Sequence, residues 1–244
     1  MAELRDEILF KQPEGSDLGD CPICCLPLPL DPQKSRLMPC CSKIICNGCS
    51  YTDIIRQRGL LIPQIPSCAF CREPVPKTEE EAEAMLMKRI EKNDPVAMRY
   101  MGGMRQDEGD FKSAFKYYTK AAELGDAVAH FNLSVMYDLG QGVEKDEKKK
   151  VYHLEEAAIG GYVSARYNLA VVEDRNGRME RAVKHWIIAA NLGHAGSMKA
   201  LWKCYAMGLV KKDALTATLH THQDAVDATK SAQREQAEDY LKRN

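Results

Sequence analysis

Eight of the ten cysteines in this 244-residue chain lie in one short segment and fall into four pairs. Three pairs have the form Cys-x-x-Cys and one is a doublet: Cys21 and Cys24, Cys40 and Cys41, Cys46 and Cys49, Cys68 and Cys71. A gap of two residues lets one tight turn direct both sulfurs at one metal ion, and four thiolates form a typical structural zinc site. The segment therefore predicts two zinc ions, each held by four cysteines.

The four pairs can be filled in sequence or alternately. Only four residues separate the doublet from Cys46, which is too short a segment to fold back as an independent site. This spacing favours alternate filling. The first and third pairs would then hold one ion, and the second and fourth pairs the other.

Other uses of the cysteines explain less of the pattern. Disulfides require an oxidising compartment, whereas the N-terminal stretch MAELRDEILFKQ carries charges where a signal peptide has its apolar core, so we expect an intracellular protein, cytoplasmic or nuclear. An iron–sulfur cluster takes four cysteines and leaves the other four without a role. Cys25 is expected to be a bystander, although its position next to Cys24 would allow the two to exchange roles.

The alternating order resembles the cross-braced RING-type zinc finger, here in an all-cysteine variant, over residues 21–74. Ile23 matches the apolar position that RING ubiquitin ligases use against an E2 conjugating enzyme, and Arg72 matches the cationic position that contacts both E2 and ubiquitin. The resemblance implies two Zn²⁺ ions and a ligase that orients the charged E2. Because such domains carry out no covalent step themselves, no catalytic residue is predicted.

The doublet departs from the family pattern, in which one or more residues usually separate these two ligands and one of them is often His. If Cys41 takes the first of the two positions, its partner falls on Lys43, which is no ligand while charged, and the second site is incomplete. Ala69 stands where ligases often have Pro. The apolar run LLIPQIP at residues 60–66 either completes the E2-facing groove or covers the metal sites.

Short elements are expected around these ligands. Residues 35–38 and 43–45 are predicted to form a small hairpin around the doublet, and residues 50–58 a helix after the third pair. Thr78 precedes three glutamates and begins a capping box with Glu81, which predicts a helix over residues 79–92.

From residue 94 onwards the chain repeats itself. Three segments carry Ala-Ala followed three residues later by Gly, at spacings of 36 and then 32 residues: AFKYYTKAAELG (114–125), KVYHLEEAAIGG (150–161) and AVKHWIIAANLG (182–193). The small pairs let a neighbouring helix approach, and the glycines suit the left-handed residue that ends a helix. Tyr118, Leu154 and Trp186 share one aligned position, so we expect them to be packing residues.

A second type of helix alternates with these segments, with Asp at the expected N-caps, so the sequence predicts four helix pairs. The pattern resembles Sel1-like repeats, relatives of the tetratricopeptide family, over residues 94–240, with the family's Gly-x-Gly-Val turn at residues 140–143. The resemblance implies an adaptor whose concave face binds protein segments. The last helices, at residues 213–220 and 223–242, are predicted to form a polar cap.

The predicted fold is a small zinc-stabilised α+β RING-like domain joined to an all-α solenoid of Sel1-like helix pairs. The domains are a flexible lead-in (1–20), the RING-type finger (21–77), a connecting helix (78–93) and the solenoid with its capping helices (94–244). Within the lead-in, Leu4, Ile8 and Leu9 form one amphipathic turn that could pack against the zinc module.

Charge and motif content narrow the class of function. Basic and acidic residues are balanced in both parts of the chain. Residues 1–77 contain 9 Lys plus Arg and 9 Asp plus Glu, and residues 78–244 contain 25 and 26. Nucleic-acid binders, in contrast, show a basic excess. No apolar run reaches the ~18 residues of a membrane span. No hydrolase triad, phosphate loop or paired-carboxylate motif stands out. The resemblances imply either a RING-type E3 ubiquitin ligase whose repeats recruit substrate, with E2 and substrate as partners, or a non-catalytic scaffold whose finger binds client proteins.

Overall fold

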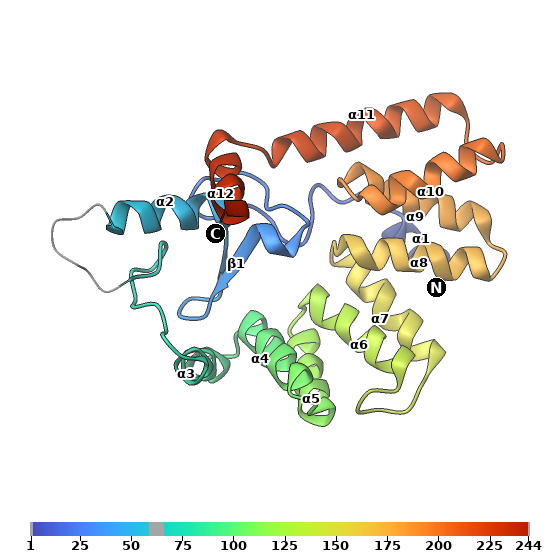
Figure 1. Cartoon of the computed structure of the whole chain (residues 1–244). Coiled ribbons are helices and arrows are strands. Elements are labelled where there is room, and N and C mark those ends of the chain that lie inside the picture. The colour runs from blue at the N-terminus through green and yellow to red at the C-terminus, as the bar shows by residue number, and fades with distance from the viewer. Residues whose placement is uncertain (1, 59–65, 244) are drawn as a thin grey trace. The chain divides into compact units, whose positions relative to one another are not determined.

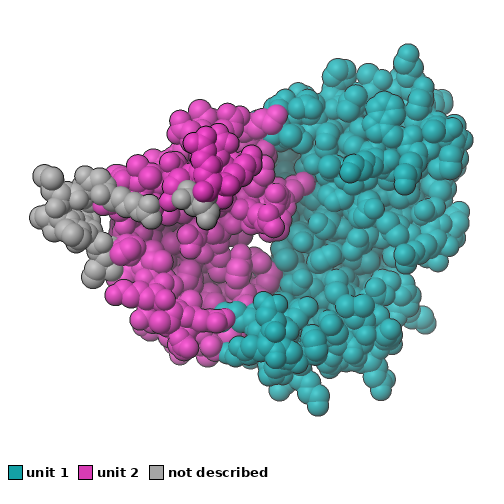
Figure 2. Space-filling model, in the orientation of Figure 1, with its two compact units in different colours: residues 1–17, 102–227 teal, residues 18–101, 228–244 magenta. Residues whose placement is uncertain are grey.

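The computed structural model describes residues 2–58 and 66–243 (Figure 1). The apolar run predicted to face an E2 or cover the metal sites falls outside these residues except for Pro66. The chain divides into two compact units, coloured separately in Figure 2. The repeat unit comprises Met1–Asp17 and Gly102–Asp227, and the cysteine unit comprises Leu18–Met101 and Ala228–Asn244.

The cysteine unit is a small α+β assembly. Strands β1 (Ser35–Met38) and β2 (Lys43–Cys46) form an antiparallel hairpin in which Ser35 lies opposite Cys46. This hairpin confirms the predicted strands, with β2 one residue longer. The other elements are η1 (Pro32–Lys34), α2 (Asn47–Arg58), α3 (Glu79–Ile90), the first half of α4 (Pro95–Asp107) and α12 (Ala232–Arg243).

The start of α3 is set by its capping residues. The Thr78 hydroxyl accepts a hydrogen bond from the Glu81 amide at 3.3 Å. The Glu81 carboxylate in turn accepts from the Lys77 amide at 2.8 Å, one residue before the position that a standard capping box uses. Two otherwise unpaired amides are thereby satisfied, and the helix predicted after Thr78 is confirmed.

The repeat unit is a succession of helix pairs, each packed against the next. Its helices after α4 are α5 (Phe111–Glu123), α6 (Ala127–Leu139), α7 (Glu147–Ile159), α8 (Val163–Arg175), α9 (Met179–Asn191), α10 (Ala195–Ala206) and α11 (Lys212–Ala228). The Asp side chains at residues 110, 126 and 146 cap α5, α6 and α7 as predicted. The predicted alternation of two helix types is therefore confirmed.

Small residues allow the pairs to approach one another. The three Ala-Ala pairs are buried, and the glycines that follow them have φ of 86°, 91° and 90°, the left-handed conformation expected after a helix end. Tyr118, Leu154 and Trp186 are all buried, as predicted for packing residues. Gly102 faces the Tyr118 ring so closely that an added Cβ would lie 2.7 Å from it. The repeat core therefore depends on large side chains fitting against residues with little or no side chain.

The two ends of the chain differ from the prediction. The N-terminal segment forms a helix, α1 (Ala2–Leu9), and belongs to the repeat unit, where Leu9 packs with Leu154 and Leu169. It is therefore neither a flexible lead-in nor a cover for the cysteines. At the other end, the first predicted capping helix does pack on the repeats, since Leu215 of α11 belongs to their core. The second, α12, packs against α2 in the cysteine unit, so it does not cap the repeats. Both errors arise because a short amphipathic helix does not encode in its own pattern which distant surface it will meet.

No helix in the described stretches is both long enough and apolar enough to cross a membrane.

Candidate metal centre

The first group of sulfurs comes from the first and third cysteine pairs. The Sγ atoms of Cys21, Cys24, Cys46 and Cys49 all lie within 4.8 Å of one another. Cys24 and Cys46 bring their Sγ atoms to 3.8 Å. The loop before β1 supplies two of these sulfurs, and the end of β2 with the start of α2 supplies the others. We call these four residues the first quartet.

The second group comes from the doublet and the fourth pair. The Sγ atoms of Cys40, Cys41, Cys68 and Cys71 also lie within 4.8 Å of one another. The distances are 4.0 Å between the Sγ atoms of Cys41 and Cys68 and 3.4 Å between those of Cys71 and Cys40. The structure therefore brings the pairs together alternately and places both doublet residues in this second quartet, whereas Lys43 is exposed.

The dimensions of both quartets fit a tetrahedral metal site. Zinc–sulfur bonds of about 2.3 Å place the sulfurs of a tetrahedron about 3.7 Å apart, close to the separations seen here. All ten cysteines are free thiols. Cys25 is exposed and lies in neither quartet. Two groups of four thiols that are near one another without being bonded suit two soft, divalent cations such as Zn²⁺.

The Cys-x-x-Cys pairs at residues 21–24 and 68–71 lie in two loops that share the same backbone conformation. In each loop the residue after the second cysteine is left-handed, with φ of 54° at Cys25 and 67° at Arg72. The Cys25 amide donates to the Cys21 carbonyl at 2.9 Å, and the Arg72 amide donates to the Cys68 carbonyl at 3.0 Å. An isolated antiparallel bridge closes each loop: Asp20 with Pro27, and Ser67 with Pro74.

The turn of the hairpin accommodates the doublet. Ser42 adopts φ of 55°, and its amide donates to the Met38 carbonyl at 2.8 Å. The Cys41 amide reaches the same carbonyl at 3.2 Å. This tight turn explains how two adjacent cysteines both reach one site although the family pattern usually separates them.

Two thiols of the second quartet are harder to ionise than an ordinary cysteine. Burial raises the pKa of the Cys41 thiol to about 11, and burial together with the neighbouring Cys71 also raises the pKa of Cys40. Thiolates are the form that binds metal, so a bound cation would have to supply the stabilisation that the surroundings lack. Metal binding to this quartet would therefore have to displace the protons of Cys40 and Cys41.

Arg234 stabilises the first quartet and was missed by the sequence prediction. This buried residue on α12 donates from Nη2 to the Cys24 Sγ at 3.4 Å and from Nη1 to the Pro27 carbonyl at 2.7 Å. Burial disfavours the Cys24 thiolate, but hydrogen bonds from the Leu26 amide and from Arg234 outweigh burial and lower the Cys24 pKa to about 7. Gly48 leaves room for this arginine, since an added Cβ would lie 2.9 Å from the Arg234 Cγ.

The two residues proposed to contact an E2 are both on the surface. Ile23 has 41% of its surface exposed, and the Arg72 side chain has 58%. Arg72 Nη1 donates to the Asp53 Oδ1 at 2.9 Å, which fixes the guanidinium beside α2. Burial opposes ionisation of Asp53, but hydrogen bonds from Arg56 and Arg72 lower its pKa overall. Asp53 is a second residue that the sequence prediction missed.

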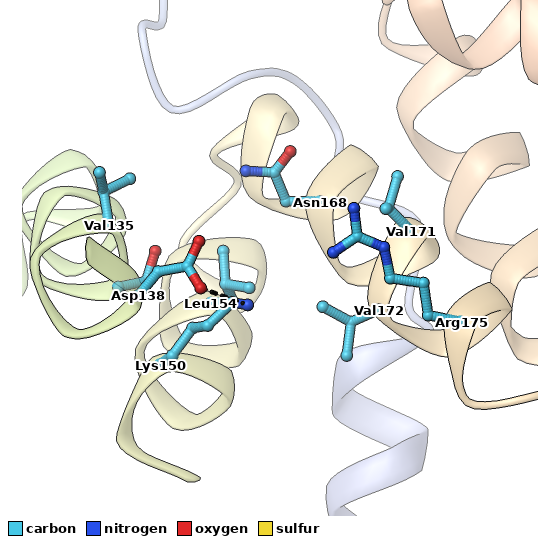
Figure 3. Close-up of a pocket in the computed structure, with 9 residues that line it drawn as sticks. Val135, Asp138, Lys150, Leu154, Asn168, Val171, Val172 and Arg175 are labelled. Atoms are coloured by element: carbon cyan, nitrogen blue, oxygen red, sulfur yellow. Dashed lines mark ion pairs between the residues drawn. The ribbon is translucent and has the colours of Figure 1, made fainter. Parts of the chain in front are cut away.

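The repeat unit contains a small hollow of mixed polar and apolar lining between α6, α7 and α8 (Figure 3). Its volume is about 190 Å³, and Asn168 and Arg175 of α8 line one side of it. On the other side, Lys150 forms an ion pair with Asp138 at 2.8 Å. The hollow therefore combines charged side chains of both signs with the apolar side chains of Val135, Leu154, Val171 and Val172.

Comparison with known proteins identifies the helical part. The profile of the Sel1 repeat matches residues 95–126, 127–162 and 163–194. DAP3-binding cell death enhancer 1 of Rattus norvegicus is 30% identical over 170 residues, which cover 53% of this chain and 33% of that protein. An F-box protein of Arabidopsis thaliana is 29% identical over 133 residues, covering 53% of this chain and 37% of that protein. The chain thus matches about a third of the length of these relatives.

A solved structure supports the same assignment. The crystal structure of a Sel1 repeat protein from Oxalobacter formigenes superposes with a TM-score of 0.53 at 28% identity, over 62% of this chain and 66% of that one. The matched segments begin at the first residues of α4, α6 and α8, and each spans one helix pair. Residues 95–194 of this chain therefore match three consecutive Sel1 repeats.

Proposed function

We propose that the cysteine unit binds two Zn²⁺ ions and acts as a RING-type ubiquitin ligase module, while the Sel1 repeats bind the protein to be modified. The observation that carries this proposal is the alternate grouping of the eight cysteines into two quartets of tetrahedral size. Zinc, when bound, supplies the cross-links that hold this small unit together, because its apolar core alone is small. The free thiols suit a reducing compartment such as the cytoplasm or nucleus.

The residues that would meet an E2 are Ile23 and Arg72. Ile23 offers an exposed apolar contact between the two ligands of the first loop, and Arg72 directly follows the last ligand of the second loop. Asp53 holds the Arg72 guanidinium in place, so less conformational entropy is lost when Arg72 donates to an E2–ubiquitin pair. The chemical contribution of this chain is orientation of the thioester for attack, with no bond formed to the chain itself.

The repeats would supply substrate recognition. Solenoids of helix pairs bury a continuous core between neighbours and leave side chains of the outer turns available to partners. The hollow lined by Asn168, Arg175 and the Lys150–Asp138 pair is one place where a polar segment could bind. The sequence and structural similarity to Sel1 repeat proteins supports a role in protein–protein interaction.

Autoubiquitination with a panel of E2 enzymes tests the ligase proposal. Zinc-loaded protein should carry two zinc atoms per chain and form ubiquitin chains with at least one E2. Arg72→Ala should lower the rate about tenfold or more, since a charge-assisted hydrogen bond is lost. Arg56→Ala is the matched control because Arg56 also pairs with Asp53. Inactivity across the panel, with both zinc atoms present, would contradict the ligase proposal.

The competing proposal is a non-catalytic scaffold whose zinc finger binds a client protein. Ala69, in place of the Pro common in ligases, and the doublet of adjacent ligands favour it. Under this alternative both zinc atoms are bound, no E2 is activated, and Ile23→Ala weakens client binding instead of ubiquitin transfer.

A further inference from the structure

The N-terminal segment occupies a surface built by three helices of the repeat unit. Arg5 Nε donates to the Glu155 Oε2 at 2.8 Å, and Arg181 Nη2 donates to the Asp6 Oδ1 at 3.0 Å. Leu9 is only 1% exposed and packs against α7 and α8. We call the surface formed by Glu155, Arg166, Arg181 and His185 the α1 site. It spans α7, α8 and α9 and is independent of the cysteine unit.

A buried arginine forms the floor of the α1 site. Arg166 of α8 is 1% exposed. Within the described residues its hydrogen bonds go to main-chain oxygens of the N-terminal segment, namely the carbonyls of Leu9 and Lys11. Its Nε has no partner among the described residues, and burial lowers its pKa to about 10. A buried guanidinium needs hydrogen-bond acceptors, and here a separate segment of the chain supplies them as carbonyls. Arg166 therefore suits a docked segment that ends in free carbonyl groups.

The end of a helix has this character. The carbonyls at the C-terminal end of α1 carry the negative end of the helix dipole. Those of Asp6 and Ile8 accept from the amides of Phe10 and Lys11, whereas the carbonyl of Leu9, the last residue of α1, accepts from Arg166. Arg166 supplies both the donors and the positive charge that these carbonyls need. The α1 site therefore recognises the direction of a bound helix as well as its side chains.

The walls of the α1 site select the side chains of its occupant. The Phe10 ring lies 4.6 Å from the His185 ring and 4.8 Å from the Arg181 guanidinium. Lys184 approaches the same ring at 5.3 Å, so the aromatic group lies among cationic side chains. The matching pattern begins with a basic residue followed directly by an acidic residue. Leu stands three positions after the acidic residue, and an aromatic residue stands four positions after it.

The contacts of α1 are suited to exchange. Its eight residues are fewer than the ~12–15 that an isolated helix needs for stability in water, so α1 is helical only because it is docked. The Arg5 and Asp6 ion pairs are partly exposed and contribute little, which leaves Leu9, Phe10 and the Arg166 contacts as the main attachment. Release of α1 would uncover a preformed site on folded repeats.

We propose that the α1 site binds short amphipathic helices of partner proteins and that α1 is its resident occupant, displaced when a partner binds. The partner segment would carry the pattern Arg-Asp-x-x-Leu-aromatic near the C-terminal end of a helix. This proposal does not depend on ligase activity or on zinc. It assigns the repeats a partner site separate from the hollow between α6, α7 and α8.

Binding of a labelled peptide with the sequence of residues 2–17 to the full-length chain tests the proposal. The variant Leu9→Ala loosens α1, so it should bind the peptide about tenfold more tightly than the wild-type chain if α1 fills the site about nine-tenths of the time. Ile8→Ala is the matched control, because Ile8 is exposed and should leave the affinity unchanged. Equal affinity of all three chains would overturn the proposal.

A charge exchange identifies the site. Arg181→Glu in the Leu9→Ala chain should lower the affinity for the wild-type peptide about tenfold, and a peptide with Asp6→Arg should restore it. Restoration also shows that the variant is folded. Failure of the exchanged peptide to bind, in a chain whose circular dichroism is unchanged, would contradict the assignment.

Hydrogen exchange on the wild-type chain checks that α1 can leave. The amides of α1 should exchange at least tenfold faster than those of α8, and an excess of unlabelled peptide should accelerate them further. If α1 exchanges only when α7, α8 and α9 unfold together, α1 is a fixed part of the fold and the proposal is wrong. A dimer in which two copies swap α1 would likewise overturn the assignment to another protein.

Discussion

The two units of this chain differ in the kind of interaction that stabilises each of them internally. In the cysteine unit, the core cluster around the ligands consists largely of the cysteines themselves, with Leu28, Met38 and Ile45 buried among them. The repeat unit has a continuous core of alanines with Trp186, Leu201 and Leu215. A repeat core can lose one contact and retain its neighbours, whereas a quartet that loses its ion loses all its links at once. Under the proposed zinc binding, this difference separates metal-dependent from packing-dependent stability within one chain.

Removal of zinc by a chelator should produce the largest difference in stability between the two units. Removal of zinc from the protein at neutral pH should unfold residues 21–77, because a structural zinc ion contributes roughly 10–16 kcal/mol to folding in small zinc domains. The amides of α5 to α10 should keep their protection. Hydrogen exchange with and without chelator measures both. Uniform loss of protection in both units would show that the repeats also depend on the metal.

Trp186→Ala is the converse experiment in the repeat unit. Trp186 is buried among Ala170, Met198 and Leu201, so its truncation should cost about 3–5 kcal/mol of the unfolding free energy of that unit. The midpoint of urea denaturation, followed through the helices, reports the loss. The zinc content should stay at two atoms per chain, and a lower zinc content would contradict the separation of the two units.

Arg234→Met distinguishes the two quartets from each other. The variant keeps the apolar stem but removes the donor to Cys24, so the first ion should be lost to a chelator about tenfold faster, as is typical for residues that support metal ligands. Arg243→Met, at the exposed end of α12, is the control. The second quartet should release its ion at the wild-type rate. Equal acceleration at both quartets would mean that α12 stabilises the unit as a whole.

A change of a single pH unit is expected to have the smallest effect, and this effect falls on the repeat unit. Burial, with the nearby Arg166 and Arg181, lowers the pKa of His185 to about 3 from an ordinary value of 6.5. The unfolded chain therefore binds this proton first, and the stability that His185 contributes is complete above pH 6.5 and is lost as the pH falls towards 3. The loss amounts to about 1.4 kcal/mol per pH unit in this window.

The variant His185→Gln isolates that contribution. Between pH 6.5 and 5.5 its unfolding free energy should fall less steeply than that of the wild type, and His220→Gln, on the exposed side of α11, should behave like the wild type. Urea denaturation at the two pH values measures the slopes. Parallel slopes for all three chains would show that another group accounts for the acid sensitivity.

Most of the repeat fold follows from local sequence patterns. The Ala-Ala pairs, the Asp caps and the glycines with positive φ each report on the few residues around them, and the structure agrees with them. The alternate grouping of the cysteines was also accessible, because a segment of four residues is too short to make an independent site. In both cases the decisive constraint acts over a short stretch of chain.

The features that the sequence did not indicate are contacts between distant residues. Arg234 reaches Cys24 across 210 positions, and Arg181 reaches Asp6 across 175. Asp53, which holds Arg72, is 19 residues away on a different element. Each of these residues looks like an ordinary surface charge in sequence, because nothing in the neighbouring residues specifies its partner. The site could therefore be predicted as a set of ligands but without the residues that support them.

The separation between Arg234 and Cys24 has a consequence for the order of biosynthesis. The cysteines leave the ribosome long before Arg234 does, since the repeats must be translated in between. Throughout that interval Cys24 is a nascent thiol without its guanidinium neighbour, open both to incoming zinc and to oxidants. Metal loading that precedes completion of the repeats would protect these thiols at the time when they are most vulnerable.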